Sequence, residues 1–318
     1  MIENVNQGDR RRPPGMLYRM ARSVWIGTVH RSKNLRQYRP RPLVLPVHYA
    51  QTPLRVKTPP VVSIVTPSFQ HGHFLARTIE SVLAQQYPRL EYVVQDGGST
   101  DDTLAVLEQY RGRLTHCESV RDRGQADAIN RGFRRTTGEI MAWLNSDDLL
   151  LPGALASVVD FFEEHPDVDV VYGHRIQIDE QDREIGRWVI PPHDSKVLRW
   201  ADYVPQETLF WRRSIWEKVG GCVDDTFRFA MDWDLLLRFQ NAGARFARLP
   251  RFLGAFRVHE QQKTSVSMRT TGAAEIARIR KAEHGREVHG PEIQWHVAGY
   301  LLRSAVLDRL IVFGIVRH

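Results

Sequence analysis

Apolar runs and amphipathic segments alternate along the chain from about residue 60 to residue 172. Four continuous apolar runs predict buried strands, because a parallel strand covered on both faces has no polar side. These runs are residues 61–66, 90–95, 139–144 and 168–172. Three segments between them have helical periodicity, namely residues 72–86, 103–110 and 152–164. This alternation predicts an α/β domain whose mostly parallel sheet is flanked by helices.

The pattern is less regular after residue 172. Residues 176–178 and 184–190 predict a hairpin, residues 208–211 a strand and residues 231–241 a helix. Residues 292–318 are rich in apolar side chains, but charged residues interrupt them, which makes a poor membrane span. A helix packed between the protein and a membrane, or at a subunit contact, fits this segment.

The chain before residue 60 differs in composition. Its first 60 residues contain eight prolines, which break regular structure. One basic amphipathic helix with a tryptophan is predicted at residues 16–29. We therefore expect three parts: a basic N-terminal arm over residues 1–58, a central domain over residues 59–265 and a helical C-terminal extension over residues 266–318.

The formal net charge of +7 on the 318 residues is unevenly distributed. Residues 1–58 contain 12 Lys and Arg against two acids, whereas residues 59–258 contain 23 Lys and Arg against 29 acids. A nucleic-acid enzyme needs positive charge where its substrate lies, so the acidic body argues against a nucleic-acid partner. The basic arm fits an anionic membrane surface, or else it packs on the body.

Composition narrows the class of protein further. Hydrophobic residues make up 42% of the chain, which is typical of a globular protein. The two cysteines, Cys117 and Cys222, cannot form a disulfide framework and lack zinc-type spacing. The N-terminus lacks the apolar core of a signal peptide, so we expect a cytoplasmic protein. No GxGxxG follows a predicted strand, which argues against a dinucleotide-dependent oxidoreductase.

Acidic side chains follow two of the predicted strands. Asp96 comes after the second strand, and Asp147 and Asp148 follow the third. Ligands of such sheets bind beyond the carboxyl ends of the strands. Two adjacent carboxylates need a positive partner, which a divalent cation on a nucleotide diphosphate would supply, unless one of them caps the next helix. Asp96 could bind the imide of a nucleobase or close a turn with the residues that follow it.

Two further positions could take part in chemistry. Asp232 and Asp234 lie two residues apart in a predicted helix, so only one can easily face a given cleft. A buried acid at the start of a helix is a candidate general base, and the other acid is then a cap or a surface charge. His259 is one of 13 histidines, and taken alone it is more simply structural.

These motifs, in this order, resemble those of glycosyltransferase family 2 enzymes, which have the Rossmann-like GT-A fold. The resemblance runs from about residue 60 to residue 265. It rests on VSIVTPSF at 62–69, TIESVLAQQYP at 78–88, VQDGGSTD at 94–101, NSDD at 145–148 and MDWDLLLR at 231–238. The segment RDRGQADAINRG at 121–132 is similar to the family segment that flanks the donor.

The resemblance implies which positions bind a nucleotide-sugar donor. Asp96 would bind the nucleobase, and Asp147 would face the ribose or a metal. The whole implied donor-binding set is Pro67, Ser68, Phe69, Asp96, Arg123, Gln125, Asn145 and Asp147. Two positions depart from the family, because Gln95 and Asn145 stand where many members have an aspartate.

The resemblance also implies a metal site and a catalytic base. Asp148 would be the main protein ligand of Mg²⁺ or Mn²⁺, with Asp147 and His259 nearby. Asp232 would be the general base that removes the proton from an acceptor hydroxyl. Family members of known stereochemistry invert the anomeric carbon, so the implied reaction is a direct displacement. The alternative is a non-catalytic nucleotide-sugar-binding scaffold of a polysaccharide assembly.

The implied partners follow from this reading. The donor would be a nucleotide diphosphate-sugar, most simply a UDP-sugar, and the acceptor a saccharide or a lipid-linked molecule in bacterial-type cell-surface polysaccharide or glycolipid synthesis. Gln206, Trp211 and Trp216 are plausible acceptor contacts in the irregular segment 174–230. The basic arm would hold the protein at an anionic membrane surface, on the inner face of the cell membrane.

Overall fold

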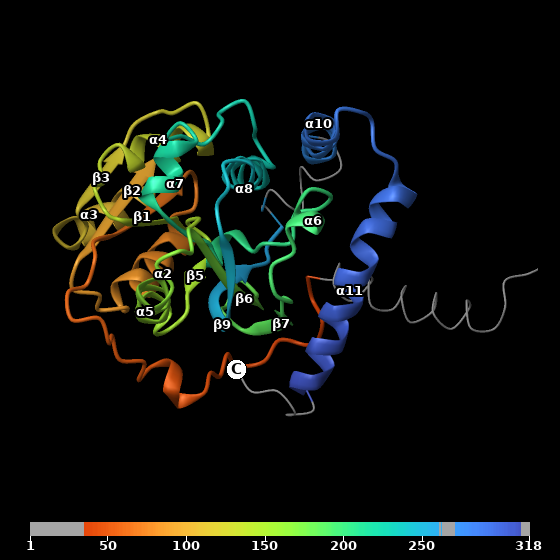
Figure 1. Cartoon of the computed structure of the whole chain (residues 1–318). Helices are drawn as coiled ribbons and strands as arrows, with labels where there is room; N and C mark the ends of the chain where they lie inside the picture. Colours follow the sequence, from red (N-terminus) through yellow and green to blue (C-terminus); the bar gives the residue numbers. More distant parts are fainter. Residues whose placement is uncertain (1–34, 261, 263–270, 313–318) are drawn as a thin grey trace, which may run out of the picture. The chain divides into compact units, whose positions relative to one another are not determined.

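The computed structural model describes residues 35–260, 262 and 271–312 (Figure 1). The predicted helix at residues 16–29 lies outside the described residues. One sheet has the strand order β3-β2-β1-β4-β8-β6-β9-β5, and β7 pairs with β6. The predicted α/β architecture with a sheet flanked by helices is confirmed.

The first half of the sheet is parallel. Its strands are β1 (Val62–Ser68), β2 (Leu90–Asp96), β3 (His116–Ser119) and β4 (Ile140–Trp143). The helices of this half are α2 (Gly72–Leu83), α3 (Thr103–Tyr110), α4 (Gln125–Phe133) and α5 (Ala154–Glu164), with a 3₁₀ turn at Arg111–Arg113. The registers pair Ser68 with Asp96, so the carboxyl ends of β1 and β2 meet at one edge.

The second half of the sheet mixes directions. Its strands are β5 (Leu149–Leu150), β6 (Val170–Ile178), β7 (Glu184–Trp188), β8 (Phe210–Arg212) and β9 (Phe246–Arg257). Its helices are α6 (Ser195–Leu198), α7 (Arg213–Lys218) and α8 (Met231–Asn241), with a 3₁₀ turn at Gln206–Thr208. The β6 strand is parallel to β9 but antiparallel to β7 and β8. The predicted hairpin is confirmed, because β6 and β7 pair across Asp179–Arg183.

Apolar side chains fill both faces of the sheet. On one face Val65, Val93 and Trp143 belong to a cluster with α4 and α8 side chains, and on the other Ile64 and Val94 belong to a cluster with α2 and α5 side chains. The continuous apolar runs of the sequence are therefore explained, because residues that alternate along these strands enter different cores.

Residues 35–58 contact the second half of the sheet. Arg41 forms a bridge with Glu184 at the start of β7, and the 3₁₀ turn Val47–Tyr49 buries Tyr49. The Tyr49 hydroxyl accepts a hydrogen bond from Phe252 N at 3.2 Å. The domain boundaries expected at residues 58 and 265 stay a prediction.

The C-terminal segment forms α10 (Ala273–His284) and α11 (Gly290–Val312). Tyr300 is the buried residue of α11, whereas Trp295, Leu302 and Val306 are exposed. These three apolar side chains therefore face outward, and a different side of α11, with Val297 and Leu307, packs against the rest of the protein. Among the described residues, no helix is both long and apolar enough to cross a membrane.

Candidate active site

The carboxyl end of β2 holds Asp96 in a closed loop. Asp96 is fully buried, and its Oδ2 accepts hydrogen bonds from Gly98 N (3.0 Å), Ser99 N (2.8 Å) and Ser119 Oγ (2.6 Å). Ser99 Oγ donates to the other oxygen at 2.6 Å. The carboxylate thus fixes the loop that follows β2, and the turn considered from the sequence is present.

The end of β1 lies beside this loop. Pro67 and Ser68 are buried at the end of the strand, while Phe69 is 58% exposed. The Ser68 Oγ and both polar side-chain atoms of the buried Gln95 have no hydrogen-bond partner among the described residues. This edge of the sheet therefore combines an exposed aromatic ring with buried polar groups whose hydrogen-bonding capacity is unused.

The turn after β4 brings three potential metal ligands together. His71, Asp147 and His259 each offer a ligand atom, and these atoms all lie within 4.8 Å of one another. His259 Nε2 lies 3.0 Å from Asp147 Oδ2, and His71 Nδ1 lies 2.8 Å from Ser146 Oγ. Asp147 and His259 were expected here from the sequence, whereas His71 was not.

The two histidines of this cluster favour the ionised form of Asp147. Burial acts to raise the pKa of Asp147, but the hydrogen bond with His259 and the nearby His71 outweigh it and lower this pKa below the ordinary value. Burial lowers the pKa of His71. The cluster therefore consists of an ionised carboxylate beside imidazole nitrogens, which is a donor set suited to a divalent metal ion.

Asp148 faces a different group of residues. Its carboxyl group accepts a hydrogen bond from Arg257 N (3.0 Å) and one from Asn145 Nδ2 (3.3 Å). Burial, reinforced by the nearby Asp147 and Glu207 carboxylates, raises the pKa of Asp148 well above its ordinary value. The role of Asp148 as the main metal ligand stays a prediction.

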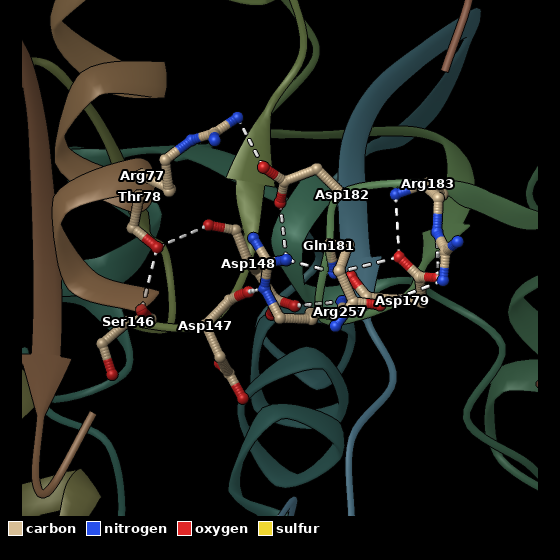
Figure 2. A network of polar contacts seen from close by, with 10 residues as sticks. All are labelled: Arg77, Thr78, Ser146, Asp147, Asp148, Asp179, Gln181, Asp182, Arg183 and Arg257. Carbon is tan, nitrogen blue, oxygen red and sulfur yellow. Dashed lines mark hydrogen bonds and ion pairs between the residues drawn. The ribbon is translucent and has the colours of Figure 1, made fainter. Parts of the chain in front are cut away.

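Arg257 connects the turn to the end of β6, as Figure 2 shows. Its side chain is 1% exposed, and its Nε donates to Asp147 O at 2.8 Å. Its Nη1 donates to Asp179 O at 3.0 Å and forms an ion pair with Asp182 at 2.5 Å. Phe74 lies under the guanidinium, 4.7 Å from ring centre to Cζ. Arg257 therefore stabilises the turn that contains Asp147 and Asp148.

Two contacts from α2 complete this support. Thr78 Oγ1 donates to Ser146 O at 2.9 Å and to Asp148 O at 2.8 Å. Arg77 forms an ion pair with Asp182, the partner of Arg257 (Figure 2). The backbone of the turn is thus held both by α2 and by the end of β9.

The side-chain amides of Gln125, Asn145 and Gln206 form a chain of hydrogen bonds at the turn after β4. Gln125 Nε2 donates to Asn145 Oδ1 at 2.6 Å, and Asn145 Nδ2 donates to Gln206 Oε1 at 3.0 Å. Gln206 Nε2 donates in turn to Trp143 O at 2.9 Å. Gln125 and Asn145, both expected to bind the donor, are therefore adjacent, and Gln206 joins them from the segment expected to bind the acceptor.

Arg123, also expected to bind the donor, lies at the surface. Its guanidinium forms ion pairs with Asp225 (2.9 Å) and Asp127 (3.3 Å), and its side chain is 72% exposed. Arg228 donates a hydrogen bond to the Arg123 carbonyl. A contact between Arg123 and the donor stays a prediction.

Asp232 lies in the first turn of α8 and is half-buried. Its Oδ1 accepts a hydrogen bond from Trp233 N at 2.9 Å. Asp202 is close enough for the two carboxyl groups to interact electrostatically. The Arg175–Glu207 ion pair (2.5 Å) lies within electrostatic reach of both Asp202 and Asp148. Asp234, two residues on, instead forms an ion pair with Arg238 at 2.8 Å.

One expectation from the sequence is wrong. Trp211 and Trp216 were plausible acceptor contacts, but they are 0% and 3% exposed. Both rings pack beside Phe133 in the core, at centroid distances of 5.8 and 5.1 Å. Burial of these large rings is favourable in itself, and it leaves them no surface with which to touch an acceptor.

Comparison with known proteins identifies the family of the chain. The model of the family described as "Glycosyl transferase family 2" matches residues 63–223. The chain is 34% identical over 185 residues to an uncharacterised glycosyltransferase of Mycobacterium tuberculosis, covering 56% of this chain and 68% of the relative. It is 30% identical to a PGL/p-HBAD biosynthesis glycosyltransferase of Mycobacterium bovis, covering 56% of this chain and 69% of the relative.

Solved structures share the fold. TarS 1–349 of S. aureus in complex with UDP-GlcNAc has a TM-score of 0.58 at 18% identity, covering 76% of this chain and 71% of that chain. The chain spans only 43% of a longer TarS structure. The mannosyltransferase PcManGT of Pyrobaculum calidifontis, in complex with GDP-Man and Mn²⁺, has a TM-score of 0.57 at 20% identity, covering 89% of this chain and 78% of that chain. The protein is a glycosyltransferase with the GT-A fold, and the chain belongs to glycosyl transferase family 2.

Proposed function

We propose that the protein transfers a sugar from a nucleotide diphosphate-sugar to an acceptor hydroxyl, with the aid of a divalent metal and with inversion at the anomeric carbon. The observation that carries this proposal is the cluster of His71, Asp147 and His259 donor atoms within 4.8 Å of one another. Asp147 of this cluster lies in the turn after β4. The β4 strand neighbours β1 in the sheet, and the ends of β1 and β2 are expected to hold the base.

The donor set fits a divalent metal. Asp147 and His259 would hold it, with Asp148 as a further acid of the same turn. A bound Mg²⁺ or Mn²⁺ would neutralise the charge that builds up on the departing nucleotide diphosphate. PcManGT, which shares the fold, was solved with GDP-Man and Mn²⁺.

The nucleotide would lie over the ends of β1 and β2. The exposed Phe69 ring offers a face on which a base can stack. Asp96 orders the neighbouring loop through its four hydrogen bonds, and Ser68 has an unused hydroxyl at the same edge. A UDP-sugar is the donor we favour, and TarS 1–349 was solved with UDP-GlcNAc.

Asp232 is proposed to be the general base. It is half-buried at the start of α8, where the helix dipole favours its ionised form. The carboxylate would take the proton of the acceptor hydroxyl as the oxygen attacks the anomeric carbon. Attack on the face opposite the leaving diphosphate forms the new C–O bond as the old one breaks, which inverts the configuration.

The test compares Asp232→Asn with Asp234→Asn. Asp232→Asn should lower kcat by about 10²–10⁴-fold, as loss of a general base does, while UDP-sugar affinity measured by calorimetry is retained. Asp234→Asn is the matched control, because its carboxyl group is tied to Arg238 on the same helix, and it should retain transfer. Full activity of Asp232→Asn would refute the assignment.

The acceptor is proposed to be a saccharide or a lipid-linked molecule of a bacterial-type cell-surface polysaccharide or glycolipid. A relative with a PGL/p-HBAD biosynthesis name supports this class. The basic N-terminal arm would place the enzyme on the anionic inner face of the cell membrane, in the cytoplasm. Deleting residues 1–34 removes seven Lys and Arg and should abolish sedimentation with anionic vesicles. Unchanged sedimentation would refute the membrane role.

A further inference from the structure

His71 lies opposite the pair formed by Asp147 and His259. It is the residue just before α2, whereas Asp147 follows β4 and His259 follows β9. Three separate segments therefore bring one ligand atom each to the same point. The His71 and His259 rings are 5.8 Å apart and nearly perpendicular, at 81°, so they are not simply stacked on one another.

Each of the three side chains is held by the surrounding structure. Ser146 Oγ fixes the His71 ring through Nδ1 at 2.8 Å. The Phe74 ring contacts both imidazoles, 6.2 Å from His71 and 4.9 Å from His259. Arg257 fixes the backbone of Asp147. Metal-binding histidines in proteins are oriented by such outer contacts, which maintain a ready-made site.

The type of donor atom indicates which metal the site prefers. Two imidazoles and one carboxylate form a set rich in nitrogen. Mg²⁺ takes oxygen ligands almost exclusively and gives up its water reluctantly. Mn²⁺ is also suited to carboxylate and water oxygen, but as a first-row transition metal it binds imidazole nitrogen too, which the later metals of the series bind more tightly. A third protein ligand would also let the ion bind before any diphosphate oxygen is present.

We propose that His71 is a protein ligand of the metal, and that the resulting site of His71, Asp147 and His259 binds Mn²⁺ in preference to Mg²⁺ in the absence of donor. This inference rests on the proposed metal-dependent function and deepens it. The remaining coordination positions of the ion are left to the donor diphosphate and water.

Direct metal binding tests the proposal without any assay of transfer. Mn²⁺ is titrated into the full chain without donor, and free Mn²⁺ is measured by its EPR signal. The wild type should bind one Mn²⁺ that about a hundredfold excess of Mg²⁺ fails to displace. His71→Ala should weaken Mn²⁺ binding by about tenfold or more, because even outer contacts of a metal site have effects of this size.

His73→Ala is the matched control. His73 lies two residues away, is exposed, and stacks on the same Phe74 ring at 3.7 Å. It contributes no atom to the cluster, so its loss should leave Mn²⁺ binding unchanged. Equal Mn²⁺ affinity in the wild type and His71→Ala would overturn the proposal. An equal loss in both variants, or displacement of Mn²⁺ by an equal concentration of Mg²⁺, would overturn it as well.

A second variant separates ligation from a purely structural role. His71→Asp replaces the nitrogen ligand by an oxygen ligand, and should shift the preference towards Mg²⁺. A residue that merely supports the fold would not change the order of metal preference. If transfer is absent while Mn²⁺ binds through His71, the proposed function fails and this inference stands. If transfer occurs while His71→Ala binds Mn²⁺ normally, the inference fails and the function stands.

Discussion

The proposed site has a nucleobase side around Asp96 and a metal side around Asp147, and these depend on contacts of very different sequence separation. On the nucleobase side, Asp96 is bound by the N–H groups of Gly98 and Ser99, two and three residues away. On the metal side, Asp147 contacts His259 at a separation of 112 residues and Arg257 at 110. The first side needs little more than its own loop and the neighbouring strands. The second forms only when β9 has joined the sheet.

This difference predicts how each side responds to damage. A local hydrogen-bonded loop persists as long as its strands pair, whereas a site built from distant segments is lost with the weakest of them. Changes in the second half of the sheet should therefore disable metal binding first. Changes to the β2 loop should affect the nucleotide and leave the metal in place.

The largest effect is expected from Arg257→Met, which keeps an unbranched apolar side chain and removes the guanidinium group. It removes the hydrogen bonds to the Asp147 and Asp179 carbonyls and the ion pair with Asp182 in a buried region. Breaking a buried ion pair in this way destabilises a protein by about 3–5 kcal/mol. Urea unfolding should show that loss, and EPR titration should show weakened Mn²⁺ binding.

Arg55→Met is the control for this prediction. Arg55 also pairs with acids, Asp160 at 3.7 Å and Glu164 at 3.5 Å, but its side chain is 72% exposed. Exposed pairs of this kind contribute about 1 kcal/mol or less. If Arg257→Met were no more destabilising than Arg55→Met, the metal side would not depend on Arg257 as described.

An intermediate effect is expected from Asp96→Asn. The amide would place an N–H group either against the Gly98 and Ser99 N–H donors and the Ser119 hydroxyl at the Oδ2 position, or against the Ser99 hydroxyl at the Oδ1 position. Leaving such buried groups unsatisfied costs about 1–3 kcal/mol. Thermal unfolding should show this loss of stability. Calorimetry should show a weaker affinity for UDP. Mn²⁺ binding without donor should be unchanged, and a parallel loss would remove the distinction between the two sides.

The smallest effect is expected in the pH dependence of the unfolding free energy, through His193. Burial lowers the pKa of His193 to about 4, and its ring stacks on Phe246 of β9 at 4.6 Å. The unfolded chain takes up this proton near pH 6.5, so the contribution of neutral His193 to stability is present above pH 6.5 and is lost as pH falls towards 4. Between pH 7 and 5 the unfolding free energy should fall by about 1 kcal/mol from this group, allowing for its partial exposure.

His193→Asn is the matched variant for this measurement. Its Oδ1 can still accept the hydrogen bond that Tyr203 Oη shares with Nδ1 at 2.8 Å, but it does not titrate. Urea midpoints measured at pH 7 and pH 5 should differ less for this variant than for the wild type. An identical pH dependence in both would show that His193 does not make the second half of the sheet sensitive to acid.

The first half of the sheet was the easier part to predict from sequence. The bounds of α3 agree with the predicted helix, and β1, β2 and β4 differ from the predicted strands by one or two residues at an end. Buried parallel strands are continuous apolar runs, so the pattern alone identifies them. Asp96, Asp147 and Asp148 could also be predicted as site residues, because they follow such runs.

The second half was harder because its longest strand is irregular. In β9, Pro250 and three arginines interrupt the apolar pattern over Phe246–Arg257. The pairing with β6 shifts register between Tyr172 and His174, and a bulge of this kind tolerates a proline within a strand. No local pattern predicted that Arg257 would be buried, because its polar partners lie 75 to 110 residues away.

His71 was missed for a related reason. It stands in a His-Gly-His sequence between a strand and a helix, where polar residues are ordinary. A signal was nevertheless present, because residues after β1 and β4 meet at one edge of a parallel sheet. The ligand atom of His71 could be recognised only once His259 had been placed opposite it by β9.

The three amides in front of the turn have a direction. Gln125 donates to Asn145, Asn145 donates to Gln206, and Gln206 donates to the Trp143 carbonyl. Because a carbonyl can only accept, it sets the orientation of every amide before it. An aspartate at position 145 could still accept from Gln125 but could no longer donate to Gln206. The amide at position 145 is therefore bound to a neighbour on each side, and an acid there would face the Gln206 carbonyl oxygen without a donor between them.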